Sequence, residues 1–126
     1  MTSVQEVIAT YLQTGGYGTL GSTIFIDFAP PTPSSCIVVT AYGGPPAVRG
    51  IGQTPRLYDI VRVQVLIRNS SPGTAISQAE SIYTYLEGSI PPGLVFVRTV
   101  NSRASYLGKD DNNLSKYSMN FEVLYA

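Results

Sequence analysis

The chain has 126 residues, and its eight Lys and Arg balance eight Asp and Glu, so the formal net charge is zero. This balance excludes the basic excess of a nucleic-acid-binding domain, and a hydrophobic content of 44% excludes a disordered chain. Charged residues make up only 13% of the sequence, about half of the usual ~25%. A surface so poor in charge tends to associate, so we expect copies of the chain or other proteins to cover part of it.

Residue counts also restrict the chemistry. The sequence contains no histidine, which excludes Ser-His-Asp and Cys-His catalysis within one chain. Its single cysteine, Cys36, lies in an apolar run, where a thiol behaves as a small hydrophobic group. No motif with metal-ligand spacing is present, so we expect no metal, no cofactor and no enzymatic activity. The first residues lack the basic and apolar regions of a signal peptide, and no apolar run approaches the ~18 residues of a membrane span, so we expect intracellular synthesis and no membrane partner.

The first predicted element is a helix over residues 3–13. Its apolar residues recur at helical spacing on one stripe, namely Val4, Val7, Ile8, Tyr11 and Leu12. Ser3 and Glu6 have the spacing of a capping box, and Gly15 with Gly16 ends the helix. Residues 17–22 are predicted to form a flexible connector.

Two strands follow. Residues 22–28 are β-branched and aromatic, which predicts a strand that the proline-rich segment 30–33 ends. Residues 36–42 are almost continuously apolar, which predicts a strand buried on both faces. Residues 43–56 are rich in Gly and Pro and are predicted to form a long loop, in which Arg49 and Arg56 are the charged residues.

The longest strand is predicted over residues 57–68, where apolar residues alternate with Arg62, Gln64 and Arg68. Ser71 then forms an N-cap, Pro72 occupies the first helical position, and Gly88 ends the helix. The buried stripe of this helix is predicted to comprise Ala75, Ile76, Ala79, Ile82, Tyr83 and Leu86.

Two more strands complete the chain. They are predicted over residues 94–100 and 115–125, with a polar loop over residues 101–114 between them. The order is therefore α-β-β-β-α-β-β. We predict an α+β fold in one domain over residues 1–126: a single, mainly antiparallel sheet of about five strands, with two helices packed on one face.

Arginines and tyrosines are the candidate interface residues. Arg62 and Arg68 share one strand face, and Arg98 and Arg103 follow on and after a later strand. A solvated sheet face explains this pattern, and so does an interface between subunits, because Arg is favoured in interfaces. The nine tyrosines support the second interpretation, since each offers a large contact area with a polar tip.

The whole chain also resembles a known family. The resemblance follows the order of a strand ending in a Pro-rich turn (residues 24–30), a strand ending Tyr42-Gly43-Gly44, the strand 63–68, the helix 79–88, the turn 107–110 and the closing strand 117–123. This pattern over residues 4–125 is similar to the tail-terminator proteins of long-tailed bacteriophages, particularly the group labelled phage minor capsid protein.

The resemblance implies a structural virion protein at the neck, made in the host cytoplasm. Such proteins form a homohexameric ring on the completed tail tube, stop tube growth, and present a docking surface for the head or its connector. DNA would pass through the lumen without specific binding, which agrees with the neutral charge. The implied partners are further copies of the chain, the tail tube protein and the head-completion or connector protein.

Three other functions stay open at this point. The chain is also compatible with another neck, tube or head-completion subunit of a phage. A small ligand-binding α+β module would show a concave apolar pocket with convergent polar groups. An enzyme that uses carboxylates, or Tyr with Arg, would need a poised pair, which the sequence does not reveal. For the ring, the first interface candidates are Arg49 and Arg56, followed by Arg62, Arg68, Arg98 and Arg103.

Overall fold

A computed structural model describes residues 3–28, 34–42, 48–49, 56–94, 96–100, 104–109 and 113–125, with side chains described except at 48–49, 56–59 and 125. Within these residues the chain forms two helices and seven strands. The helices are α1 (Val4–Thr14) and α2 (Pro72–Leu86). The strands are β1 (Ile24–Ile26), β2 (Cys36–Ala41), β3 (Val48–Arg49), β4 (Arg56–Asn69), β5 (Phe96–Thr99), β6 (Ser105–Lys109) and β7 (Ser115–Tyr125).

The strands form one mostly antiparallel sheet with the order β1-β2-β4-β7-β5. In addition, β6 pairs with the first half of β7, and β3 pairs with the first residues of β4. The pair β1–β2 is parallel, and every other pair is antiparallel. The long strands β4 and β7 form the centre of the sheet and align from Asp59 opposite Tyr125 to Asn69 opposite Ser115.

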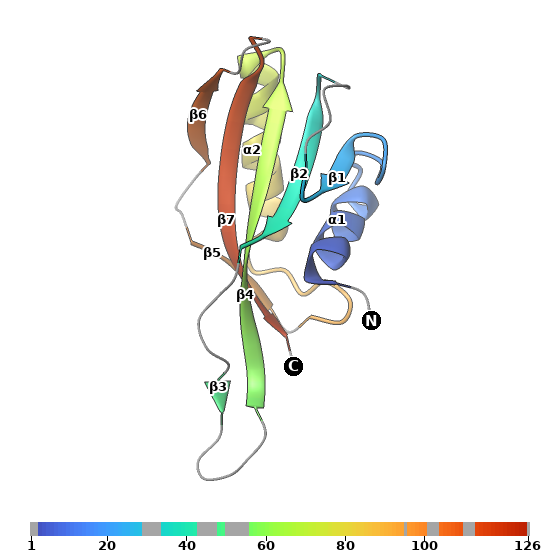
Figure 1. Cartoon of the computed structure of the whole chain (residues 1–126), viewed down its shortest axis with the longest axis vertical. Helices are drawn as coiled ribbons and strands as arrows, with labels where there is room; N and C mark the ends of the chain where they lie inside the picture. The colour runs from blue at the N-terminus through green and yellow to red at the C-terminus, as the bar shows by residue number, and fades with distance from the viewer. Residues whose placement is uncertain are drawn as a thin grey trace.

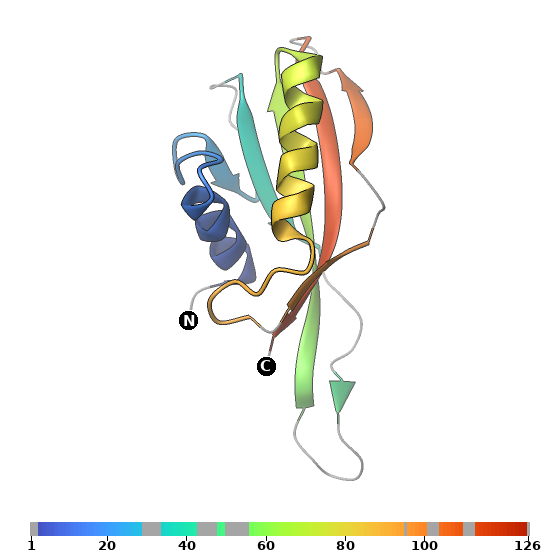
Figure 2. The ribbon, with the colours of Figure 1, turned by 180° about the vertical axis from the view of Figure 1, so that it is seen from behind.

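Both helices cover the same face of the sheet, as a comparison of Figures 1 and 2 shows. Helix α1 packs on β1 and β2, and α2 packs on β4, β7 and β5. The core lies between the two layers and consists of alternate residues of the strands together with the inner stripes of the helices. Its largest fully buried side chains include Phe121, Met119, Ile67, Ile8 and Ile82.

The caps of both helices form as predicted. Ser3 Oγ accepts a hydrogen bond from the backbone N–H of Glu6 at 3.2 Å, and Ser71 Oγ accepts one from Thr74 at 3.4 Å. Gly16 has a φ of 84° after α1, and Gly88 has one of 71° after α2, both in the region that favours glycine. The fold class is thereby confirmed: two helices lie on one face of a mainly antiparallel sheet.

Local details differ from the prediction in three places. The predicted loops 43–56 and 101–114 contain the short strands β3 and β6, which form because the long strands β4 and β7 offer free edges to them. The predicted strand 22–28 is reduced to three residues, and the proline run 30–33 lies outside the described residues. The connector 17–22 is held by hydrogen bonds, among them Leu20 N–H to Gln13 Oε1 at 2.8 Å and Tyr17 Oη with Ser81 Oγ at 2.8 Å.

Candidate subunit and partner interface

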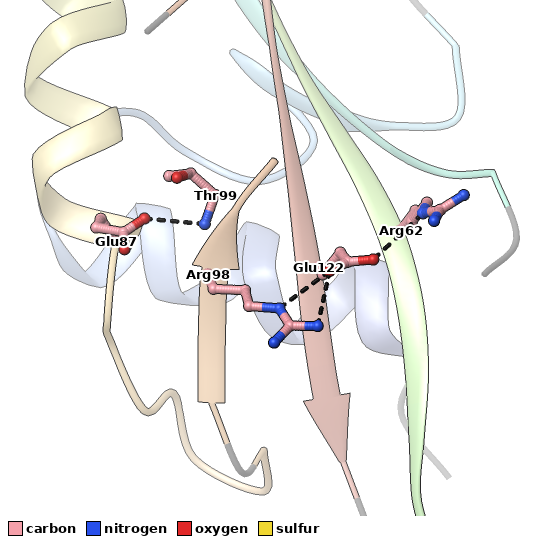
Figure 3. A network of polar contacts seen from close by, with 5 residues as sticks. All are labelled: Arg62, Glu87, Arg98, Thr99 and Glu122. Carbon is pink, nitrogen blue, oxygen red and sulfur yellow. Dashed lines mark hydrogen bonds and ion pairs between the residues drawn. The ribbon is translucent and has the colours of Figure 1, made fainter. Parts of the chain in front are cut away.

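Three charged side chains form a row across the face of the sheet that the helices leave uncovered. The register aligns Arg62 of β4, Glu122 of β7 and Arg98 of β5 (Figure 3). Arg98 Nε donates to Glu122 Oε1 at 3.0 Å, and Arg98 Nη2 forms an ion pair with the same oxygen at 2.9 Å. Arg62 Nε donates to Glu122 Oε2 at 3.4 Å. One carboxylate thus joins three adjacent strands.

This row presents positive charge to the surroundings. The Glu122 side chain is only 17% exposed, whereas the side chains of Arg62 and Arg98 are 46% and 47% exposed. Two guanidinium groups share one carboxylate, so the row carries a net charge of +1. Guanidinium groups that keep free donors are suited to binding a carboxylate or phosphate of a partner.

Charge is divided between the two layers. Neither α1 nor α2 contains Lys or Arg, and their charged residues are Glu6 and Glu80. Among the residues whose side chains are described, every cation lies on a strand: Arg62, Arg68, Arg98, Lys109 and Lys116. A chain that is neutral as a whole therefore has an acidic helical layer and a basic sheet. Different charges on different faces suit an assembly in which unlike surfaces meet.

The prediction that Arg68 is a surface residue is wrong. Arg68 alternates with Ile67 and so lies on the same face of β4 as Arg62, but it is only 5% exposed. Its register partner Cys36 and the nearby Val38 and Ser118 on this face are buried as well. Strand alternation identifies the face on which a side chain lies, but it does not show whether that part of the face is covered.

The remaining arginines are only partly described. The register pairs Arg49 of β3 with Arg56 of β4, which brings the two first interface candidates to facing positions. Strand β3 and the first residues of β4 lie beyond the part of the sheet that the helices cover (Figure 1). The side chains of both residues, and Arg103 entirely, lie outside the described residues.

Tyrosines act within the chain as well as on its surface. Tyr85 of α2 stacks on Tyr11 of α1 with 4.6 Å between ring centroids, and its hydroxyl donates to the Tyr11 carbonyl at 2.9 Å. Tyr17 lies against the same ring at 5.3 Å. Burial, followed by the neighbouring Tyr11, raises the pKa of Tyr85 above its ordinary value. These partly buried rings join α1 to α2 and pack against the core.

Apolar side chains are exposed at both edges of the sheet. At the β1 edge, a hollow of about 530 Å³ lies between α1 and β1 and is lined in part by Leu20, Phe25 and Phe28. At the opposite edge, Tyr106 and Leu107 of β6 are each 54% exposed. The sequence did not identify these residues, because Leu20 falls in a predicted connector, Tyr106 and Leu107 fall in a predicted loop, and the exposure of Phe25 and Phe28 depends on the neighbouring strand.

A second hollow, of about 610 Å³, lies between the turn after α1 and the first half of α2. Hydroxyl and amide side chains, such as Thr74, Ser77 and Gln78, form part of its lining together with the buried Cys36. The described residues contain no group of three or more His, Cys, Asp or Glu that would hold a metal ion. Nor does any described helix have the length and hydropathy to span a membrane.

Comparisons with known proteins identify a solved structure of similar fold and a matching family. It is similar to a solved chain from the virion of a native gene transfer agent particle, with a TM-score of 0.58 and 16% sequence identity. The match covers 97% of this chain and 86% of that chain. No curated protein sequence matches. A family model described as bacteriophage tail terminator protein matches residues 11–126, and the chain belongs to that family of structural phage proteins.

Proposed function

We propose that the chain caps the completed tail tube of a phage as a homohexameric ring and presents a docking surface for the head or its connector. It would act in the neck of the virion, after synthesis in the host cytoplasm, and without catalysis. Membership of the tail terminator family supports this proposal, and so does the likeness in fold to a chain of a virion particle.

The observation that carries the docking role is the register of the β3–β4 hairpin. Arg49 and Arg56 occupy facing positions there, at a site that extends beyond the helical layer (Figure 1). Arginine is well suited to charge-assisted hydrogen bonds with a carboxylate of a partner. The hairpin is therefore suited to the axial contact between this ring and the next protein of the neck.

The first test is the mass and shape of the purified chain. Light scattering should give six times the 13.5 kDa of one chain, and negative-stain images should show a ring with a central hole. If the ring forms only on its target, purified tail tubes should gain a ring-shaped cap when the chain is added. Tubes that continue to grow and carry no cap would contradict the proposal.

The hairpin has its own test. The double variant R49E/R56E should fold and form the ring but abolish the joining of heads to tails. The matched control is R49K/R56K, which keeps both charges and should retain part of the joining activity. A normal yield of virions from the glutamate variant would show that the hairpin is not the docking contact.

A further inference from the structure

The β1 edge of the molecule carries an apolar groove. Phe25 and Phe28 approach each other with 6.3 Å between ring centroids, and Leu20 lies beside them in the same hollow of about 530 Å³. Phe28 is 65% exposed, which is a large value for an aromatic side chain of a folded protein. The exposed carboxylate of Glu6 belongs to the lining of this β1 groove. The groove is thus lined mainly by apolar side chains, with a carboxylate on the α1 side.

The opposite edge carries a protruding apolar side chain. The register of β6 on β7 passes from Tyr106 opposite Tyr117 to Gly108 opposite Lys116, so Leu107 is the extra residue of a β-bulge. Gly108 has a φ of 96°, a conformation that favours glycine and fixes the bulge. Tyr106 is held against Tyr117 at 5.1 Å, which anchors the strand on one side of Leu107. The exposed Lys109 follows two residues later.

These two features lie at opposite edges of one sheet. Strand β1 ends the sheet on one side, and β5 and β6 end it on the other (Figure 1). A contact between two different surfaces of the same chain leaves one free surface on each copy, so it repeats and closes into a ring when the rotation permits. The proposed ring needs a contact of this kind.

The opposite charges of the groove and the bulge favour a second copy of the chain as the molecule that occupies the groove. The groove has a carboxylate, Glu6, in its lining, and the bulge is followed by an ammonium group, Lys109. Across a contact the apolar side chain would enter the apolar base while the two opposite charges meet at its border. An apolar centre with a polar, solvent-accessible rim is the usual anatomy of a protein–protein interface.

We propose that Leu107 of each copy inserts into the β1 groove of the next copy, with Lys109 beside Glu6 of that neighbour. This inference rests on the proposed ring and identifies the surfaces that build it. The bulge is the projecting element, and Phe25, Phe28 and Leu20 form the receiving surface.

Cross-linking tests the contact directly. The variant carries L107C and F28C, with the buried Cys36 unchanged, and is treated with a short thiol-to-thiol cross-linker, both alone and bound to tail tubes. The two new thiols lie at opposite edges, so a cross-link between them joins different copies and should produce a ladder that ends at six chains. The control pair L107C/I90C uses Ile90, which is 68% exposed and lies in the loop after α2, and should give no such ladder.

The outcomes separate this inference from the proposed function. A particle of six chains without the ladder would show that the ring uses another contact, which overturns the inference alone. A chain that neither forms a ring nor caps tubes overturns both. Cross-linking of L107C to a tube protein in place of a second copy would assign the bulge to a different partner and also overturn the inference.

Charge exchange supplies a second readout. E6K and K109E should each raise the concentration at half-assembly by roughly tenfold, and the double variant E6K/K109E should restore it to within about threefold of the wild type. Thermal melts of the four proteins separate assembly from folding, because E6K also weakens the first turn of α1. Additive losses in the double variant would show that the two charges do not meet.

Discussion

Arg98 contacts a single oxygen of Glu122 through both a hydrogen bond from Nε and an ion pair from Nη2, although the two residues lie on different strands. The same carboxylate uses its second oxygen for Arg62, so one acidic side chain fixes the register of β4, β7 and β5 at one level of the sheet (Figure 3).

Replacing Glu122 by Gln should lower the free energy of unfolding by about 1 kcal/mol. The loss is small because both arginines are about half exposed, and exposed pairs contribute roughly 0.2–1 kcal/mol each. Urea unfolding at low and high salt checks this, since salt screens the pairs and should shrink the difference. The control is E80Q, which removes one negative charge from the exposed face of α2. An equal loss in both variants would show that the row has no specific effect.

Two Gly→Ala variants should change the free energy of unfolding in opposite directions. A Cβ at Gly15 would lie 2.7 Å from Cζ of Tyr85, and that ring cannot withdraw easily because it stacks on Tyr11 and bonds its carbonyl. We expect G15A to destabilise the fold by about 1–3 kcal/mol through overpacking. A Cβ at Gly73, in the first turn of α2, meets no atom within 4 Å, so G73A should stabilise by about 0.4–1 kcal/mol.

Thermal denaturation of both variants against the wild type measures the two effects. Gly15 has a φ of −75°, which alanine also adopts, so a loss in G15A reports on the contact with Tyr85 and not on backbone strain. An unchanged melting temperature in G15A would mean that Tyr85 moves at no cost.

Burial raises the pKa of the Cys36 thiol above its ordinary value of 9.0, although Arg68 and Lys116 act in the opposite direction. The folded state therefore holds this proton more tightly than the unfolded chain does. The resulting stability is present below pH 9.0 and is lost as the pH rises through the raised pKa. Urea midpoints measured on both sides of pH 9.0 should fall toward alkaline pH, and less so in C36A. Part of the decline should persist in that variant, since the pKa of Tyr85 is raised as well.

The effect of the β6 bulge on assembly should be distinguishable from its effect on the stability of the fold. Gly108 and Gly16 have φ values of 96° and 84°, and a Cβ added at either position would meet no atom within 4 Å, so alanine meets the same backbone strain at both. Each variant should lose about 1–3 kcal/mol. G108A should also weaken assembly, because it displaces Leu107, whereas G16A should not. Light scattering at one concentration distinguishes them, and equal assembly of the two variants would contradict a role for the bulge.

Much of the fold was predictable because the long elements carry strong local signals. The alternation in residues 115–125 predicts the bounds of β7, and the residue types around Ser3 and Ser71 predict both caps without any tertiary contact. The short strands β3 and β6 were missed. Their sequences contain few strand-forming residues, and they form only because β4 and β7 present edges to them.

The candidate interface was less predictable than the fold. Arg62 and Arg98 were recognised as related cations, but Glu122 between them was not, because its position depends on the register of three strands. Arg68 has the same alternation as Arg62 and yet is buried. Leu107 has no distinguishing local pattern, since the pairing with β7 creates the bulge. Features that arise from strand pairing cannot be predicted from a single sequence, because the sequence does not give the register of the strands.

The two lysines of the chain, Lys109 and Lys116, lie on the adjacent strands β6 and β7, near one end of their ladder. Reagents that acylate side-chain amines would therefore modify one edge of the protein and leave the helices and the β1 groove unmodified. A protein immobilised on a sensor surface through these amines would be oriented, with its β1 edge directed into solution. Coupling confined to these two side chains would therefore hold every molecule in a similar orientation.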